Sequence, residues 1–328
     1  MEFQHELFDF DNCIALEEMF EKCFDAKSTV GYFDWKYKLN PAGKAIAFVA
    51  KHNGQIAAFY GVIPEYYIMN GKKELIYQSM DTMTHPDFQR KGLFTNLANQ
   101  TYDHIRASKG KLTVLGFPGE ISYPGFIKKL DWSTLIEHKY QFTNEHLFKF
   151  RNLGNKISRF KIKPVQSFDE EFDQYFRNKV YGHKPISKYL DQAILNWKIC
   201  DSPMMKYKVV KISEDNEIKG FVIYRIDEKN RIFLVCIDFI VSKHITDFIT
   251  SVCRYLFSKL HPKAIYTFQS STNSINEGLR RNGFINNPFS KGPFSYRTPL
   301  IIYGDRQVDK INVFDVKNWD IQPYLRDY

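Results

Sequence analysis

The sequence has few cysteines and no pattern typical of a disulfide framework or a metal centre. Its five cysteines are an odd number and include no CxxC pair; they are Cys13, Cys23, Cys200, Cys236 and Cys253. This usage argues against a disulfide scaffold and against structural zinc. The histidines and cysteines also lack metal-ligand spacing, so we expect no metal cofactor and a reduced, cytoplasmic protein.

The sequence also lacks a long apolar run. The most apolar segment, Ile232–Val241, is about half the length of a membrane span and contains Asp238. The first residues, Met1–Glu6, are acidic where a secretory signal would be basic, and no apolar stretch follows them. We therefore expect an intracellular protein without a membrane span. The sequence also has no Gly-x-Ser-x-Gly elbow and no Walker A loop.

Positive charge is in excess, with a formal net charge of +9. Such a balance favours anionic partners. Basic residues gather between Lys149 and Lys163, which is compatible with a nucleic-acid or membrane patch. No zinc-finger spacing, RNA-binding aromatic signature or long basic helix accompanies the cluster, so we interpret it as a solvated linker and expect no nucleic-acid partner.

The most informative stretch is Asp81–Phe94, with the run that follows it. It reads as a strand, a short basic loop and the start of a helix, whose apolar residues continue at helical spacing to Arg106. The loop is Gln89-Arg90-Lys91-Gly92. Unpaired N–H groups at a helix N-terminus, a glycine that permits close approach, and flanking cations together favour a pyrophosphate. The alternative is a solvated basic turn.

Gln89–Phe94 resembles motif A of the GNAT acetyltransferase superfamily, Gln/Arg-x-x-Gly-x-Gly/Ala, which binds the pyrophosphate of acetyl-CoA. It matches the first four positions and departs at Phe94, and the Thr84-His85-Pro86 lead-in is usual for the superfamily. The resemblance implies acetyl-CoA as cosubstrate. The residues it implies for binding are Met83, Thr84, Gln89, Arg90, Lys91, Gly92, Leu93, Phe94 and Thr95.

An internal repeat is the second strong feature. Phe33–Tyr37 (FDWKY) recurs as Leu195–Ile199 (LNWKI), and Phe126–Trp132 aligns with Gly278–Phe284. Each early copy is followed by a strand, a polar turn and a strand, over residues 45–51, 52–54 and 55–63, and over 207–212, 213–216 and 217–226. Asn-Gly after an apolar run is a strong hairpin signal. A repeat of this length predicts duplicated domains.

The predicted class is α+β, in two tandem acyl-CoA N-acyltransferase-like domains of GNAT type. Each would have a mixed, mainly antiparallel sheet flanked by helices. We assign residues 1–150 to an N-terminal domain that binds acyl-CoA and residues 151–328 to a degenerate copy. In the second copy Asp238–Asp247 takes the place of the loop and has no glycine, so it would not easily wrap a pyrophosphate.

The resemblance also implies a set of catalytic roles. A backbone N–H near Met83 would polarise the thioester oxygen, and Asp81 would be the general base, unless it only holds a neighbouring backbone N–H. The tyrosine that many relatives use as general acid is replaced by Ile127. Tyr123 could serve as the acid or be a packed aromatic, and a CoA thiolate can leave without a strong acid. His85 is interpreted as a phosphate neighbour or a surface residue.

The first functional hypothesis is an acetyl-CoA-dependent N-acetyltransferase acting on a small amine, for example an amino sugar of surface polysaccharide biosynthesis. The alternatives are a FemABX-like peptidyltransferase that uses aminoacyl-tRNA, and a non-catalytic binding protein of the same fold. The sequence leaves open the acceptor, N- or O-transfer, the acyl chain length, the oligomeric state and the role of the tail Gln322–Tyr328.

Overall fold

The computed structural model describes residues 1–153, 160–180, 184–229, 232–241, 244–268, 273–287 and 298–321. Lys156 and Arg159 of the basic cluster, Ser242 and Lys243 of the second loop, and the tail Gln322–Tyr328 lie outside the described residues.

The chain folds into two compact units, each built from several segments. Unit 1 comprises described residues of 1–136, 201–204 and 299–315, and unit 2 comprises described residues of 137–200, 205–298 and 316–321. The division of function at residue 150 stays a prediction.

Unit 1 is built on a mixed sheet. Its spatial order is β1 (Gln4–Leu7), β2 (Ile46–His52), β3 (Gln55–Met69), β4 (Lys72–Thr84), β5 (Thr113–Gly116), β15 (Thr298–Gly304) and β6 (Ser133–His138). β4 and β5 are parallel, whereas the pairs β1–β2, β2–β3, β3–β4 and β5–β15 are antiparallel. The predicted mixed, mainly antiparallel sheet is confirmed.

Two Asn-Gly turns set the lengths of the central strands. Asn53 and Gly54, between β2 and β3, have φ of 49° and 79°. Asn70 and Gly71, between β3 and β4, have φ of 48° and 80°. Positive φ at both positions is the geometry of the tight hairpin turn that Asn-Gly favours. The first predicted hairpin is confirmed, and β3 runs past the predicted end at Ile63 because only the second turn reverses the chain.

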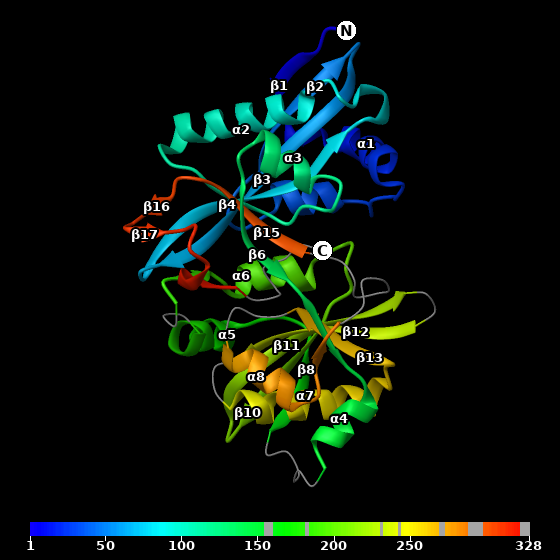
Figure 1. Cartoon of the computed structure of the whole chain (residues 1–328), viewed down its shortest axis with the longest axis vertical. Coiled ribbons are helices and arrows are strands. Elements are labelled where there is room, and N and C mark those ends of the chain that lie inside the picture. Colours follow the sequence, from blue (N-terminus) through cyan, green and yellow to red (C-terminus); the bar gives the residue numbers. More distant parts are fainter. Residues whose placement is uncertain are drawn as a thin grey trace. The chain divides into compact units, whose positions relative to one another are not determined.

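Helices cover both faces of this sheet (Figure 1). They are α1 (Ile14–Phe24), the single π-helical turn η2 (Asp34–Lys38), α2 (Leu93–Lys109) and α3 (Tyr123–Lys129). Successive side chains of a strand point to opposite faces. On β3, Tyr60 packs against Tyr102 of α2 and Phe126 of α3, whereas its neighbour Phe59 packs against Tyr37 of η2. The helix predicted from Leu93 is confirmed. The short elements η1 (Phe10–Asn12), η3 (Pro86–Phe88), β16 (Gln307–Val308) and β17 (Ile311–Asn312) complete unit 1.

A buried network of hydroxyl groups fixes α2 to the sheet. The Tyr60 and Tyr102 hydroxyl oxygens lie 2.6 Å apart, and Trp132 Nε1 donates to the Tyr102 hydroxyl at 3.1 Å. Tyr303 of β15 stacks on Tyr102 with ring centroids 4.6 Å apart. Burial raises the pKa of Tyr60 far above its ordinary value, so this network is neutral at every physiological pH.

Removing the central hydroxyl should destabilise unit 1. We expect Tyr102→Phe to lower the free energy of unfolding by about 1–3 kcal/mol, because the buried Trp132 N–H loses its acceptor. Urea denaturation would measure the change. The matched control is Tyr303→Phe, which keeps the ring stack and leaves the network intact. It should lower the free energy of unfolding clearly less than Tyr102→Phe does. Equal losses in the two variants would contradict the role given to the network.

Unit 2 has its own mixed sheet. The spatial order is β8 (Lys161–Val165), β10 (Lys208–Glu214), β11 (Glu217–Lys229), β12 (Ile232–Val241), β13 (Ala264–Phe268), β7 (Tyr140–Thr143) and β14 (Ile285–Asn286). The predicted second hairpin is confirmed as β10–β11, with positive φ at Asp215 and Asn216. α7 (Ile245–Leu260) packs on β12, and α8 (Asn273–Arg281) packs on α7. The remaining elements are α4 (Glu145–Arg151), α5 (Glu170–Tyr175), η4 (Phe176–Val180), β9 (Ile186–Lys188), α6 (Gln192–Leu195), η5 (Asn196–Cys200), η6 (Val316–Asn318) and β18 (Trp319–Asp320).

The two units share one strand order. In each, the strands run in sequence until the last pair, where a strand from elsewhere in the chain is inserted: β15 between β5 and β6, and β7 between β13 and β14. Each also has a π-helical turn around a buried tryptophan, Trp35 in η2 and Trp197 in η5. These features agree with the sequence repeat, and the duplication stays a prediction. At the start of α7, His244 has a φ of 53° where α2 has a glycine.

Within the described part of the chain, no helix combines the length and apolar character needed to cross a membrane.

Candidate functional site

The loop between β4 and α2 ends in an uncapped helix N-terminus. Gly92 is the N-cap residue, with a φ of 76°, and no side chain bonds to the first-turn N–H groups. A Cβ atom added to Gly92 would meet nothing within 4 Å, so the space above the loop is open. Together with the helix dipole, the amides of Leu93, Phe94 and Thr95 therefore form a candidate anion-binding site.

The side chains of the loop add positive charge to this candidate anion-binding site. Gln89, Arg90 and Lys91 are exposed, and neither cation makes an ion pair with a carboxylate of the described residues. The Thr95 hydroxyl donates to the Gly92 carbonyl at 2.9 Å, so this side chain stabilises the helix start. The predicted loop residues thus lie around the helix N-terminus, with two cations that make no ion pair among the described residues.

Beside the loop, β4 separates from β5. The parallel pairing runs from Tyr77 only to Ser79, opposite Gly116, whereas β4 continues to Thr84. The β3–β4 register shifts between Phe59 and Gly61, and Asp81 lies at this bulge with a φ of 42°. A bulge bends its strand and re-aims its side chains. The last residues of β4 therefore lie beyond the end of the pairing with β5, and we call their side facing away from β3 the open edge.

The ladder decides which amides face that edge. The His85 N–H donates to the Ala57 carbonyl at 2.9 Å, and Met83 lies opposite Phe59 in the same register. Because N–H groups alternate in direction along a strand, the Met83 amide faces β3 and the Thr84 amide faces the open edge. The donor predicted near Met83 thus corresponds to Thr84 in this ladder, and the Met83 side chain is buried.

Cys23 of α1 lies at this open edge. Burial raises the pKa of its thiol above the ordinary value, and a hydrogen bond with the Thr84 backbone opposes the rise. Among the described cysteines, Cys13, Cys23, Cys200 and Cys253 form no disulfide bond. Cys23 therefore marks the side of β4 on which the Thr84 amide is directed.

Asp81 is held by two side chains of η2. Its Oδ2 atom accepts a hydrogen bond from the Tyr37 hydroxyl at 2.7 Å and lies 3.0 Å from the Lys36 ammonium. The Asp81 side chain is 14% exposed, and the Lys36 side chain is 3% exposed. Both contacts are to Oδ2, so Oδ1 remains for another partner. Sequence reasoning missed Lys36 and Tyr37 as neighbours of Asp81, although both belong to the FDWKY repeat.

Tyr123 is the first residue of α3. Its hydroxyl lies 2.7 Å from the Thr134 Oγ1 of β6, and its ring packs at the edge of the core together with Ile127. Asp81 and Tyr123 thus contact different residues, and no hydrogen bond joins them. Either hydroxyl can donate in this pair, so Tyr123 can accept from Thr134 and keep its own O–H for a substrate.

His85 is buried, with 7% of its surface exposed, so the surface interpretation is wrong. Its Nδ1 atom accepts from the Asp87 N–H at 3.3 Å, and its ring lies 5.4 Å from that of Phe88.

The family model described as "Acetyltransferase (GNAT) domain" matches residues 9–135. Over these residues the chain is similar to GNAT acetyltransferase domains. The match contains the loop, the open edge of β4, η2 and the whole of α3. No curated protein sequence is significantly similar to the chain.

Solved structures extend the GNAT fold over nearly the whole chain. A GCN5-related N-acetyltransferase from Anabaena variabilis is 11% identical with a TM-score of 0.68, covering 92% of this chain and 72% of that one. A probable N-acyltransferase from Enterococcus faecalis, titled as of unknown function, is 11% identical with a TM-score of 0.69 and the same coverage. Saccharomyces cerevisiae N-myristoyltransferase with bound myristoyl-CoA is 12% identical with a TM-score of 0.60, covering 98% and 84%. At these identities the likeness shows the fold.

The GNAT domain accommodates Phe94 by a compensating glycine. The Phe94 ring packs edge-on against Phe126 of α3, with centroids 5.0 Å apart, and lies 6.0 Å from Tyr60. A Cβ atom on Gly125 would come within 3.2 Å of the Phe94 ring. The side chain at the divergent motif position therefore fills space on α3.

Proposed function

We propose that the chain is an acetyl-CoA-dependent N-acetyltransferase that modifies a small amine in the cytoplasm. The observation that carries the proposal is the uncapped N-terminus of α2, with Gly92 and two unpaired cations, directly beyond the strand that separates from β5. This arrangement suits a ligand with a pyrophosphate at one end and an extended amide-bearing arm at the other.

The cosubstrate would be held by two sets of groups. The amides of Leu93, Phe94 and Thr95 would bind the pyrophosphate, with Gln89, Arg90, Lys91 and Gly92 around it. The open edge of β4 at Thr84 would pair with the pantetheine arm, with the buried Met83 side chain supporting the strand beside it. A backbone amide costs no reorganisation when charge develops on the thioester oxygen, so the Thr84 N–H suits the polarising role.

Asp81 would act as the general base through Oδ1, directly or through a water molecule. Its bonds from Tyr37 and Lys36 fix the carboxylate at the bulge and leave one oxygen for the amine. Tyr123 would protonate the leaving sulfur while its oxygen accepts a hydrogen bond from Thr134. A CoA thiol ionises near pH ~8.5, as a free cysteine does, so the thiolate can also leave unaided.

The acceptor and the acyl group define the finer part of the proposal. An amino sugar of surface polysaccharide biosynthesis is the acceptor class we propose, and acetyl is the acyl group. Similar folds include a structure containing myristoyl-CoA, so longer acyl-CoA molecules belong in the same experiment. A peptidyltransferase using aminoacyl-tRNA is the second candidate, because the net charge of +9 favours a polyanion.

Calorimetry with acetyl-CoA, followed by measurement of thiol release with a panel of amines and amino sugars, tests the function. Saturable binding and amine-dependent release support it. Binding without release to any amine would leave an acyl-CoA-binding protein. Absence of acyl-CoA binding, together with binding of aminoacyl-tRNA, would establish the second candidate.

Loss of the loop cations should weaken the binding of acetyl-CoA but not the binding of acetyl-pantetheine. We expect the double change Arg90→Ala and Lys91→Ala to raise the Kd for acetyl-CoA by about tenfold or more, since charge-assisted bonds to phosphate are lost. Binding of acetyl-pantetheine, which has no pyrophosphate, should not change. Lys109→Ala, at the other end of α2, is the matched control. Equal weakening of both ligands would contradict the assignment of the loop to the pyrophosphate.

A further inference from the structure

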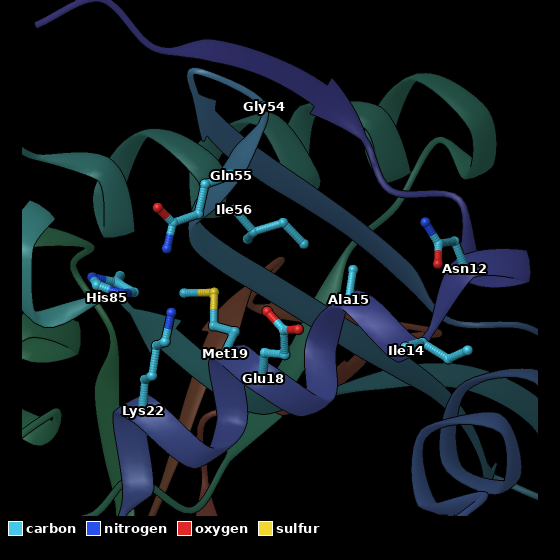
Figure 2. A pocket seen from close by; sticks show the side chains of 10 residues that line it. All are labelled: Asn12, Ile14, Ala15, Glu18, Met19, Lys22, Gly54, Gln55, Ile56 and His85. Atoms are coloured by element: carbon cyan, nitrogen blue, oxygen red, sulfur yellow. The ribbon is translucent and has the colours of Figure 1, made fainter.

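A cavity of about 280 Å³ lies in unit 1 between α1 and the β2–β3 turn. It is lined by Glu18, Met19 and Lys22 of α1, by Gln55 and Ile56 at the start of β3, and by His85 after β4. Figure 2 shows the His85 ring, the Lys22 ammonium and the Gln55 amide at one end of this space. No role proposed above for acyl-CoA binding or acyl transfer uses the cavity.

His85 presents an unsatisfied donor to the cavity. Its Nε2 atom is buried and has no hydrogen-bond partner, while Nδ1 accepts from the Asp87 N–H. A neutral imidazole that accepts at Nδ1 carries its hydrogen on Nε2, and a charged imidazole carries one on both nitrogens. Nε2 is therefore a donor in either state. A buried donor without an acceptor is costly, so an acceptor is needed at this point.

The charges around the cavity suit a ligand that carries both signs. Glu18 and Lys22 are separated by four residues on α1, a spacing at which ion pairs form readily. They make no such pair, and neither has another ion-pair partner among the described residues. Lys22 lies with His85 at one end, and the Glu18 carboxylate faces the cavity beside Met19 (Figure 2). An acceptor belongs at the His85 end and a cation beside Glu18.

We propose that this cavity is a binding site for a small amino carboxylate, such as a free amino acid. The carboxylate would accept from His85 Nε2–H and from the Lys22 ammonium, with the Gln55 amide beside it. The ammonium group would face Glu18, and Met19 and Ile56 would contact the aliphatic part. The volume accommodates a ligand of this size, since it lies just below that of drug-sized pockets at ~300 Å³.

The cavity uses side chains to which the proposed acyl transfer gives no role. His85 directly follows Thr84, whose amide is proposed to polarise the thioester, so one end of the cavity adjoins the proposed acyl-CoA arm. The roles proposed for Asp81, Tyr123 and the loop do not need Glu18 or Lys22. Ligand binding is therefore tested without acyl-CoA, so that its failure can be distinguished from failure of the acetyltransferase proposal.

Calorimetry of the full chain with each of the standard amino acids, without any acyl-CoA, tests the proposal. We expect saturable one-to-one binding of at least one amino acid. Lys22→Ala and His85→Ala should each weaken it by about tenfold or more, because a charge-assisted or buried hydrogen bond is lost. Glu18→Gln should weaken binding of the amino acid but not binding of propionate, because propionate has no ammonium group. Lys27→Ala, an exposed lysine just beyond α1, should change nothing.

Three outcomes would overturn the proposal. The first is no saturable binding of any amino acid at millimolar concentration. The second is binding that persists in Lys22→Ala and Glu18→Gln; both side chains are exposed, so these variants keep the test valid if His85→Ala fails to fold. The third is propionate or inorganic phosphate binding as tightly as the amino acid, which would establish only an anion site.

Discussion

Gly92→Asp should lower the affinity for acetyl-CoA at least about a hundredfold. The new carboxylate would lie where the pyrophosphate is proposed to bind, and two like charges ~4 Å apart repel by several kcal/mol near a protein surface. Gly92 also has a φ of 76°, a conformation that costs other residues roughly 1–2 kcal/mol. Calorimetry would measure the Kd for acetyl-CoA and for acetyl-pantetheine.

The matched control lies at the other end of the same helix. Gly110 caps the C-terminus of α2 with a φ of 71°, and a Cβ atom there meets nothing within 4 Å. Gly110→Asp therefore introduces the same charge and the same backbone strain away from the loop. We expect its Kd for acetyl-CoA to stay within about threefold of the wild type, since the dipole effect there is under ~1 kcal/mol. An equal loss of acetyl-CoA affinity in both variants would show that the loop is not part of the binding site.

Asp81→Asn should reduce turnover by about a hundredfold or more while leaving the Kd for acetyl-CoA nearly unchanged. A general base contributes ~10²–10⁴-fold to a proton transfer, and an amide cannot accept that proton. Asparagine tolerates positive φ, so the bulge at position 81 should persist. Steady-state rates and calorimetric Kd values for acetyl-CoA, measured on the same variant, would check both expectations.

Neighbouring variants separate chemistry from positioning. Tyr37→Phe removes one donor to Asp81 Oδ2 and keeps the carboxylate, so we expect turnover to fall far less. If Asp81→Asn turns over normally, Asp81 only holds η2 against the bulge. If Tyr37→Phe is as damaging as Asp81→Asn, the interaction with η2 and not proton transfer is what catalysis requires.

Local sequence patterns predicted much of unit 1 because each depends on neighbouring residues. Asn-Gly pairs favour tight turns through their own backbone preferences, and Gly92 before an apolar helical pattern marks a helix start. The hairpins, β4 and α2 followed from such signals. The loop residues Gln89–Thr95 are contiguous, so finding the motif located the whole of this candidate anion-binding site.

Residues joined only by folding were not predictable in this way. Lys36 and Tyr37 reach Asp81 across more than forty positions of sequence, and Gly125 accepts the Phe94 ring from another helix. The strand β15, from near the end of the chain, completes the sheet of unit 1. No local pattern encodes these partners, because long-range pairing depends on how all the elements pack.

Periodicity, turn chemistry and residue spacing were enough to predict the fold class, the glycine-bearing basic loop and the repeat in the sequence. Only the folded chain shows that the Thr84 amide faces the open edge, that Asp81 lies at a bulge beside Lys36 and Tyr37, and that His85 is buried with an Nε2 atom that has no partner among the described residues. Strand register and burial set these features, and both are properties of the assembled sheet and its covering helices.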